Sequence, residues 1–128
     1  MNKHLEKWHQ YVASKQHSKL DEILADDVCF HSPVVHTPQQ GKAITAKYLI
    51  AADHVLNNEH FRYVNEISDK NLTVLEFETM LDGLYLNGVD MITWNDAGKI
   101  IDFKVMVRPL KAVNMIHAMM GKMLQANT

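Results

Sequence analysis

The stretch from residue 88 to residue 109, GVDMITWNDAGKIIDFKVMVRP, constrains the fold of this chain more than any other. In its first half Asp90, Ile92 and Trp94 fall on one face of a strand, because side chains alternate with a period of two. The residues NDAG then supply a turn. In the second half the apolar residues at 101, 103, 105 and 107 share a face, and Pro109 ends the strand. A two-stranded ribbon is only marginally stable alone, so other elements must cover its apolar face.

The rest of the chain alternates between helical and strand patterns. Helical spacing predicts helices over residues 2–16, 42–56 and 110–124, and a short helix with Ser18 as its N-cap. Period-two patterns predict strands over 28–32, 61–68 and 72–81, and a strand from 84 into the central stretch. Short turns between successive strands indicate an antiparallel sheet. We expect one α+β domain over residues 1–128, in which a strongly curved antiparallel sheet wraps around the N-terminal helices as a cone with an internal pocket.

Composition excludes several classes of function. The 128 residues suit one domain, and a formal net charge of -2 offers no surface for nucleic acid. No apolar run is long enough to span a membrane, and the N-terminal residues lack the apolar core of a signal peptide. The single cysteine, Cys29, excludes an internal disulfide, so we expect a cytoplasmic protein.

Several segments resemble the nuclear transport factor 2-like superfamily and its SnoaL-like, or polyketide cyclase-like, branch. These segments are LDEILADDVCFHSP, the GKAI opening of the predicted third helix, VDMITWNDAGKI and the tail VMVRPLKAV. None of these segments is specific alone, but their order and spacing are those of the superfamily. The resemblance covers nearly the whole chain. The resemblance implies the conical α+β fold, a pocket, and pairing of two copies through the convex face of the sheet.

Ketosteroid isomerase is the most informative member of the superfamily for comparison. Its two oxyanion donors resemble Tyr11, within Tyr-Val-Ala, and Asp90. Its general base lies just before a proline, and here Ser32 occupies that position, which cannot accept a proton from carbon at neutral pH. Limonene epoxide hydrolase, another relative, uses an Asp–Arg–Asp arrangement. The positions of its aspartates in the last strand fall near Val105 and Arg108 here, so the resemblance implies that this arrangement is absent. The resemblance therefore implies a pocket, and it argues against the reactions of ketosteroid isomerase and limonene epoxide hydrolase.

Asp90 and Tyr11 are the candidates for chemistry. A buried Asp90 would have a raised pKa and could donate a hydrogen bond to a ligand carbonyl, together with the Tyr11 hydroxyl. Each residue also has an alternative role that is purely structural. Asp90 could form a hydrogen bond with the backbone or with Tyr11, and Tyr11 could pack in the core. His36, on the loop at the expected pocket mouth, is a candidate base, whereas alternation places His31 outward.

The expected pocket is mostly apolar with a few polar groups. We predict that the ligand contacts residues from the strands and from the longest helix, namely Phe30, Ser32, Tyr48, Leu75, Phe77, Thr79, Trp94, Phe103 and Val105. Glu76 and Glu78 share the strand face opposite Leu75 and Phe77, and we interpret them as surface charge or a dimer contact. The histidines form no H-x-x-x-H or H-E-x-x-H spacing and Cys29 stands alone, so we predict neither a metal nor a cofactor.

These residues suit a small lipophilic molecule that carries a carbonyl or hydroxyl group. One hypothesis is cofactor-free proton transfer of the isomerase or cyclase type, with Asp90 as acid or oxyanion donor and His36 or Asp90 as base. The alternative is a module that binds its ligand without chemistry, or a dimer that acts through interaction alone. We expect a homodimer formed through the convex sheet face.

Overall fold

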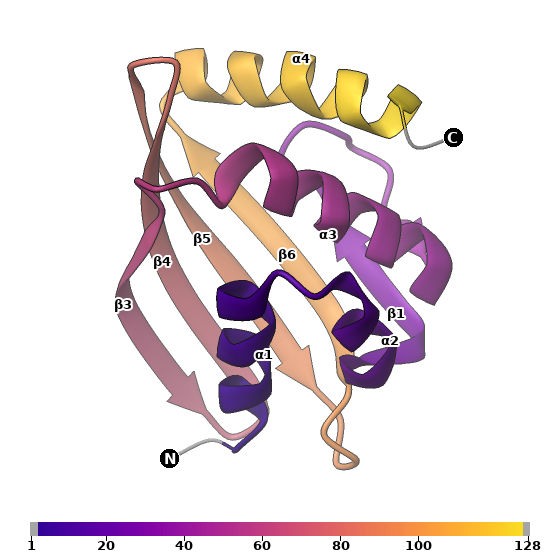
Figure 1. Cartoon of the computed structure of the whole chain (residues 1–128). Coiled ribbons are helices and arrows are strands. Elements are labelled where there is room, and N and C mark those ends of the chain that lie inside the picture. Colours follow the sequence, from indigo (N-terminus) through magenta and orange to yellow (C-terminus); the bar gives the residue numbers. More distant parts are fainter. Residues whose placement is uncertain (1–2, 127–128) are drawn as a thin grey trace.

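The computed structural model describes residues 3–126, which form four α-helices and one sheet (Figure 1). The helices are α1 (Lys3–Ser14), α2 (Leu20–Ile23), α3 (Lys42–Leu56) and α4 (Leu110–Ala126), with a 3-10 turn at His17–Lys19 before α2. The strands are β1 (Leu24–His31), β2 (Gln39–Gln40), β3 (Arg62–Asp69), β4 (Leu72–Leu81), β5 (Leu84–Trp94) and β6 (Ile100–Arg108). The predictions for α3 and β4 are confirmed to the residue. The predicted start of the first helix at residue 2 lies outside the described residues.

The six strands lie in the order β2-β1-β6-β5-β4-β3. Strands β3 to β6 run antiparallel through successive turns, as predicted. The expectation of a purely antiparallel sheet is wrong at β1, which pairs in parallel with β6. A parallel pair needs a long connection, and here α3 and four strands separate its two members along the chain. The fold is therefore α+β with a mixed sheet.

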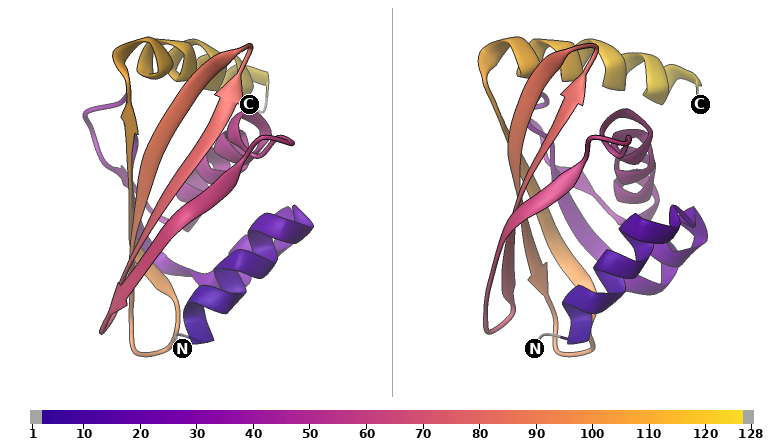
Figure 2. Two further views of the ribbon diagram at one scale, coloured as in Figure 1. Left: turned by 90° about the vertical axis from the view of Figure 1, so that its left-hand side faces the viewer. Right: turned by 60° about the vertical axis from the view of Figure 1, so that its left-hand side comes forward.

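All four helices lie on one side of this sheet, and its other face carries none of the described helices (Figures 1 and 2). The inner faces of β4 and β5 follow the predicted alternation: Thr73, Leu75 and Phe77 are buried, as are Ile92 and Trp94. Their neighbours on the outer face are half-buried or exposed. The alternation thus divides each strand between the core and the outer face.

Two local predictions are wrong. A bulge between Thr93 and Trp94 pairs Trp94 with Ile100, so Ile100 is fully buried while Ile101, predicted to face inward, is only half-buried. Ser18 lies inside the 3-10 turn, and no side-chain hydrogen bond caps that turn or α2. Both errors concern short-range backbone geometry that apolar spacing does not encode. None of the described helices is both long and apolar enough to cross a membrane.

Candidate functional site

A cavity of about 70 Å³ lies between the inner face of the sheet and helices α1, α3 and α4. Most of its wall is apolar or aromatic, and a few polar groups interrupt it. The residues that line it are Trp8, Tyr11, Val12, Phe30, Ser32, Pro33, Leu49, Ala52, Asp53, Leu56, Asn57, Phe61, Tyr63, Phe77, Asp90, Phe103, Val105, Val107, Ile116 and Met120. The cavity is roomy enough for several waters or for one end of a larger molecule.

Asp90 reaches the cavity from the middle of β5 and is 7% exposed. Its Oδ2 accepts a hydrogen bond of 3.3 Å from the Tyr63 hydroxyl, which in turn accepts one of 3.0 Å from Nε1 of Trp8. Burial raises the pKa of Asp90 to about 7, although the hydrogen bond from Tyr63 opposes the rise. Asp90 is therefore a carboxyl group that can hold its proton near neutral pH.

Tyr63 is the partner of Asp90 that the sequence analysis missed. Burial and the nearby Asp90 raise the pKa of Tyr63 well above its ordinary value, so its hydroxyl remains a donor. Its ring packs edge-on against Phe61 and Phe77, with centroid separations of 5.1 and 6.5 Å. The signal in the sequence was an aromatic residue on the same strand face as Phe61.

Tyr11 also lies in the cavity wall, but the structure does not join it to Asp90 by a hydrogen bond. The side chain is 1% exposed, and within residues 3–126 its hydroxyl has no hydrogen-bond partner. Burial, followed by the charge of Asp53, raises the pKa of Tyr11, so the hydroxyl keeps its proton. A buried hydroxyl without a partner carries a desolvation cost that a ligand oxygen can remove.

Asp53 provides a second carboxyl group in the cavity wall, and the sequence analysis did not single it out. It projects from α3, with Oδ2 lying 3.2 Å from Nε2 of His17 and Oδ1 accepting a bond of 2.8 Å from Asn57. Its side chain is only 9% exposed. Asn57 also donates to the carbonyl of Val12, which fixes this group between α1 and α3.

Five of the nine predicted ligand contacts line the cavity: Phe30, Ser32, Phe77, Phe103 and Val105. Aromatic packing connects several of them, with Phe103 centred 5.0 Å from Trp8 and 6.0 Å from Phe30. The hydroxyl oxygen of Ser32 accepts a hydrogen bond of 3.2 Å from the backbone of Val34. Ser32, the residue that the resemblance aligns with the isomerase base, therefore lines the cavity and accepts a hydrogen bond from the following loop.

The other four predicted contacts, and His36, do not line this cavity. Leu75 and Trp94 point inward but belong to the filled part of the core, where Nε1 of Trp94 donates to Thr73. The hydroxyl of Thr79 is bonded to the Leu56 carbonyl and to Asn58. Tyr48 packs against Phe30, and His36 is exposed on its loop. Alternation identifies the inward side chains but does not separate cavity from solid core.

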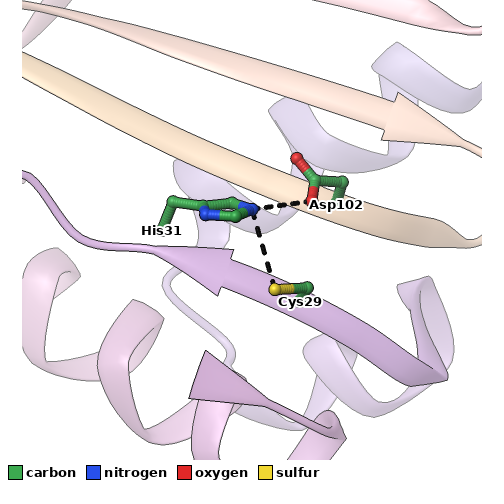
Figure 3. A group of neighbouring side chains, drawn as sticks. All are labelled: Cys29, His31 and Asp102. Carbon is green, nitrogen blue, oxygen red and sulfur yellow. Dashed lines mark hydrogen bonds and ion pairs between the residues drawn. The ribbon is translucent and has the colours of Figure 1, made fainter. Parts of the chain in front are cut away.

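On the outer face of the sheet Glu76 and Glu78 lie as predicted, away from the cavity. Hydrogen bonds from Asn65 and Asn87 lower the pKa of Glu76, and bonds from Arg62 and Tyr85 lower that of Glu78. Neither carboxyl group is therefore poised to hold a proton near neutral pH. The predicted isolation of Cys29 is wrong, because its thiol lies beside His31 and close to Asp102 (Figure 3).

No protein-family model matches the sequence. No curated protein matches it either. Solved structures do. A steroid delta-isomerase from Pseudomonas aeruginosa is 33% identical, with a TM-score of 0.91, over 97% of this chain and 90% of that protein. A protein of cystatin-like fold from Silicibacter pomeroyi is 31% identical, with a TM-score of 0.88, over 95% and 85% of the two chains.

More distant matches share the fold alone. An NTF2-like protein from Burkholderia xenovorans is 16% identical, with a TM-score of 0.65, over 87% of this chain and 88% of that one. A candidate polyketide cyclase from Sinorhizobium meliloti is 13% identical, with a TM-score of 0.65, over 83% and 95%. The chain therefore has the nuclear transport factor 2-like fold and belongs to the family of the Pseudomonas aeruginosa and Silicibacter pomeroyi proteins.

Proposed function

We propose that the cavity is a binding pocket for a small lipophilic molecule with a carbonyl or hydroxyl group, and that it supports cofactor-free proton transfer. One observation carries the proposal: the Tyr11 hydroxyl and the Asp90 carboxyl group are both buried in the wall of one apolar cavity. The hydroxyl of Tyr11 has no partner in the described part of the chain. A ligand carbonyl oxygen would accept hydrogen bonds from both groups.

The electrostatics favour donors over acceptors at this end of the pocket. Asp90 holds a proton below pH about 7, and Tyr63 already engages its Oδ2, which leaves Oδ1 to donate to the ligand. A protonated aspartic acid in an apolar site is the arrangement by which ketosteroid isomerases stabilise an oxyanion. The match to a steroid delta-isomerase supports a flat, ketone-bearing ligand, seated in the cone that a curved sheet would form.

The proton acceptor in our proposal is Asp53. Ser32 cannot serve, and His36 is exposed outside the cavity, whereas the Asp53 carboxylate lies in the wall. It would take a proton from the carbon beside the carbonyl, so the C–H electron pair becomes a C=C bond and the carbonyl pair moves to oxygen. Tyr11 and Asp90 would stabilise that oxygen, and Asp53 would return the proton to another carbon. His17 and Asn57 would hold Asp53 in place.

A steroid with an isolated double bond near its ketone is the probe that tests this reaction, because migration of the bond into conjugation changes ultraviolet absorbance. In the enzyme case Tyr11→Phe should lower kcat by about 100- to 1000-fold. Asp53→Asn should lower it by about 100- to 10,000-fold. Asp96→Asn, in an exposed turn, is the control and should leave the rate unchanged. Equal rates in the wild type and the Asp53→Asn variant would exclude Asp53 as the base.

The second candidate function is binding without chemistry, which the serine at position 32 favours. In that case the probe binds but does not react, and Asp90→Asn leaves affinity largely intact because an amide also donates. Fluorescence quenching of Trp8, which lines the cavity, measures binding independently of turnover. Turnover by the wild type that is abolished in Asp90→Asn would decide for the enzyme.

We also propose that two copies pair through the outer face of the sheet, in the cytoplasm. Val89 is the register partner of Met106, and Val74 is the register partner of Met91. These four residues, the outer apolar patch, are half-buried except for Met106, which is 47% exposed. Burial of such a patch against a second copy would remove apolar surface from water.

A further inference from the structure

Three side chains of the kinds that bind metals converge on the outer face of the sheet. Cys29 and His31 are alternate residues of β1, so both project from the same face. Asp102 lies on the parallel strand β6 and is the register partner of Cys29. One ligand atom from each residue lies within 4.8 Å of the other two (Figure 3). All three residues are half-buried.

The sulfur and the carboxylate approach the same atom of the imidazole. Nε2 of His31 lies 2.9 Å from Oδ1 of Asp102 and 3.6 Å from Sγ of Cys29. A single ring nitrogen carries at most one proton, so it cannot donate to both neighbours. In a nucleophilic relay the thiol and the carboxylate would engage opposite ring nitrogens, which differs from the arrangement found here. A metal ion placed between these three atoms would instead bind the nitrogen lone pair, the thiolate and the carboxylate together.

We propose that Cys29, His31 and Asp102 bind one Zn²⁺ ion as three ligands of a tetrahedral site with an open fourth position. Thiolate, imidazole and carboxylate are the ligands that Zn²⁺ takes in proteins, whereas Mg²⁺ and Ca²⁺ prefer oxygen alone. Zn–S and Zn–N bonds of about 2.3 and 2.0 Å at a tetrahedral angle place sulfur and nitrogen about 3.6 Å apart. That is the Cys29–His31 separation of 3.6 Å. The same geometry places nitrogen and oxygen about 3.3 Å apart, so zinc binding would widen the His31–Asp102 separation of 2.9 Å by a few tenths of an ångström.

The surroundings of the sulfur support this assignment. Nε2 of Gln40 donates a hydrogen bond of 3.4 Å to Sγ of Cys29. Gln40 belongs to β2, whose pairing with β1 sets it directly opposite Cys29. Hydrogen bonds of this kind from outside the ligand set orient a ligand and tune the metal. The two strand pairings of β1 therefore position both the ligands and this supporting donor.

The site is independent of the cavity and of the ligand-binding function proposed for it. It lies on the opposite face of the sheet, and none of its ligands lines the cavity. An open fourth position leaves room for water, for a small anion or for an activated hydroxide. Failure of the zinc proposal would consequently leave the ligand-binding proposal intact, and the reverse also holds.

Zinc binding is tested on the full chain after treatment with a chelator. Titration calorimetry with ZnCl₂ should show one equivalent bound, and Cys29→Ser or Asp102→Asn should weaken binding at least about 100-fold, because loss of a ligand exceeds loss of an outer partner. Gln40→Ala keeps every ligand and should cost about tenfold. The control is His36→Gln, which removes an exposed histidine and should leave affinity unchanged.

Cobalt absorbance tests the same site without any substitution. The chain has a single cysteine, so a thiolate-to-metal charge-transfer band on addition of Co²⁺ can only arise from Cys29. The proposal predicts that band and its loss on addition of excess Zn²⁺. No band, or zinc affinity that is equal in the wild type, Cys29→Ser and Asp102→Asn, would overturn the proposal. Equal affinities would assign the bound zinc to other histidines.

Discussion

The Tyr63 hydroxyl lies 3.3 Å from Oδ2 of Asp90 and donates a hydrogen bond to it. Because Trp8 donates to the same hydroxyl, a chain of two hydrogen bonds runs from α1 across β3 to β5. The bond from Tyr63 favours the charged form of Asp90, and burial favours the neutral form. Burial is the larger effect, so Asp90 rests with its pKa close to neutrality.

The first prediction concerns stability and pH. Burial raises the pKa of Asp90 from 3.8 to about 7, so the native protein holds a proton that the unfolded chain has released across that window. The free energy of unfolding should therefore fall as pH rises from about 4 to about 7, by roughly 4 kcal/mol from this residue. Urea denaturation at several pH values measures it, and Asp90→Asn should remove this part of the slope.

The control for that series is Asp96→Asn, which changes an exposed aspartate and should retain the wild-type slope. Above pH about 7 the Asp90→Asn variant should be the more stable protein, because it no longer buries a charge. A wild type and an Asp90→Asn variant with parallel pH profiles would mean that Asp90 is ionised normally in the native state.

The second prediction separates Tyr63 from the other tyrosines. Tyr63→Phe removes the hydrogen bond that stabilises the Asp90 carboxylate, so the pKa of Asp90 should rise above its wild-type value of about 7. An NMR titration of the side-chain carboxyl carbon measures this pKa. Tyr85→Phe removes a tyrosine hydroxyl that is bonded to Glu78 on the outer face, and it should leave the Asp90 titration unchanged. A fall in the pKa of Asp90 would contradict this account.

The third prediction uses two glycines. A Cβ at Gly88 would lie 2.9 Å from the backbone oxygen of Met106 and would overlap the ring of Phe77, a cavity residue. Gly88→Ala should therefore destabilise the protein by about 1–3 kcal/mol and weaken ligand binding. A Cβ at Gly121 of α4 meets nothing within 4 Å, so Gly121→Ala should stabilise by about 1 kcal/mol. Thermal and urea unfolding give both values.

The fourth prediction tests the proposed dimer. Met106→Glu places a charge in the outer apolar patch, where two such charges would face each other across a symmetric interface. Sedimentation at several concentrations should show a dimer for the wild type and a monomer for this variant. Leu110→Glu is the control, because Leu110 is 73% exposed at the start of α4. A monomeric wild type would overturn the proposal.

Local patterns in the sequence predicted the elements whose signals are local. Apolar spacing located α3 and β4 to the residue, and alternation assigned Asp90 to the inner face of β5. Pairing between distant segments carries no such signal. The parallel contact of β1 with β6, and the meeting of Cys29 with Asp102, join residues far apart in the chain and could not be predicted from spacing.

The contents of the site were predictable only in part for a related reason. Leu75 and Phe77 are equivalent by alternation, yet only Phe77 borders the cavity, because the part of a sheet face that stays open depends on how segments distant in the chain pack over it. The residue that bonds to Asp90 was chosen by three-dimensional proximity, which favoured Tyr63 over Tyr11. In the sequence Asp53 has the appearance of an ordinary polar helix residue. Its place in the cavity wall depends on the packing of α1 against α3, which local patterns do not encode.

The neighbourhood of β1 and β6 also bears on how this protein assembles during synthesis. The first long strand has its parallel neighbour near the other end of the chain, so it leaves the ribosome well before that neighbour exists. Contacts of such high sequence separation slow the search for the native state. Until β6 arrives, β1 presents an unpaired edge, and the hairpins of β3 to β5 can form without it. The proposed zinc ligands can come together only after β6 has paired with β1, which is a late step of synthesis.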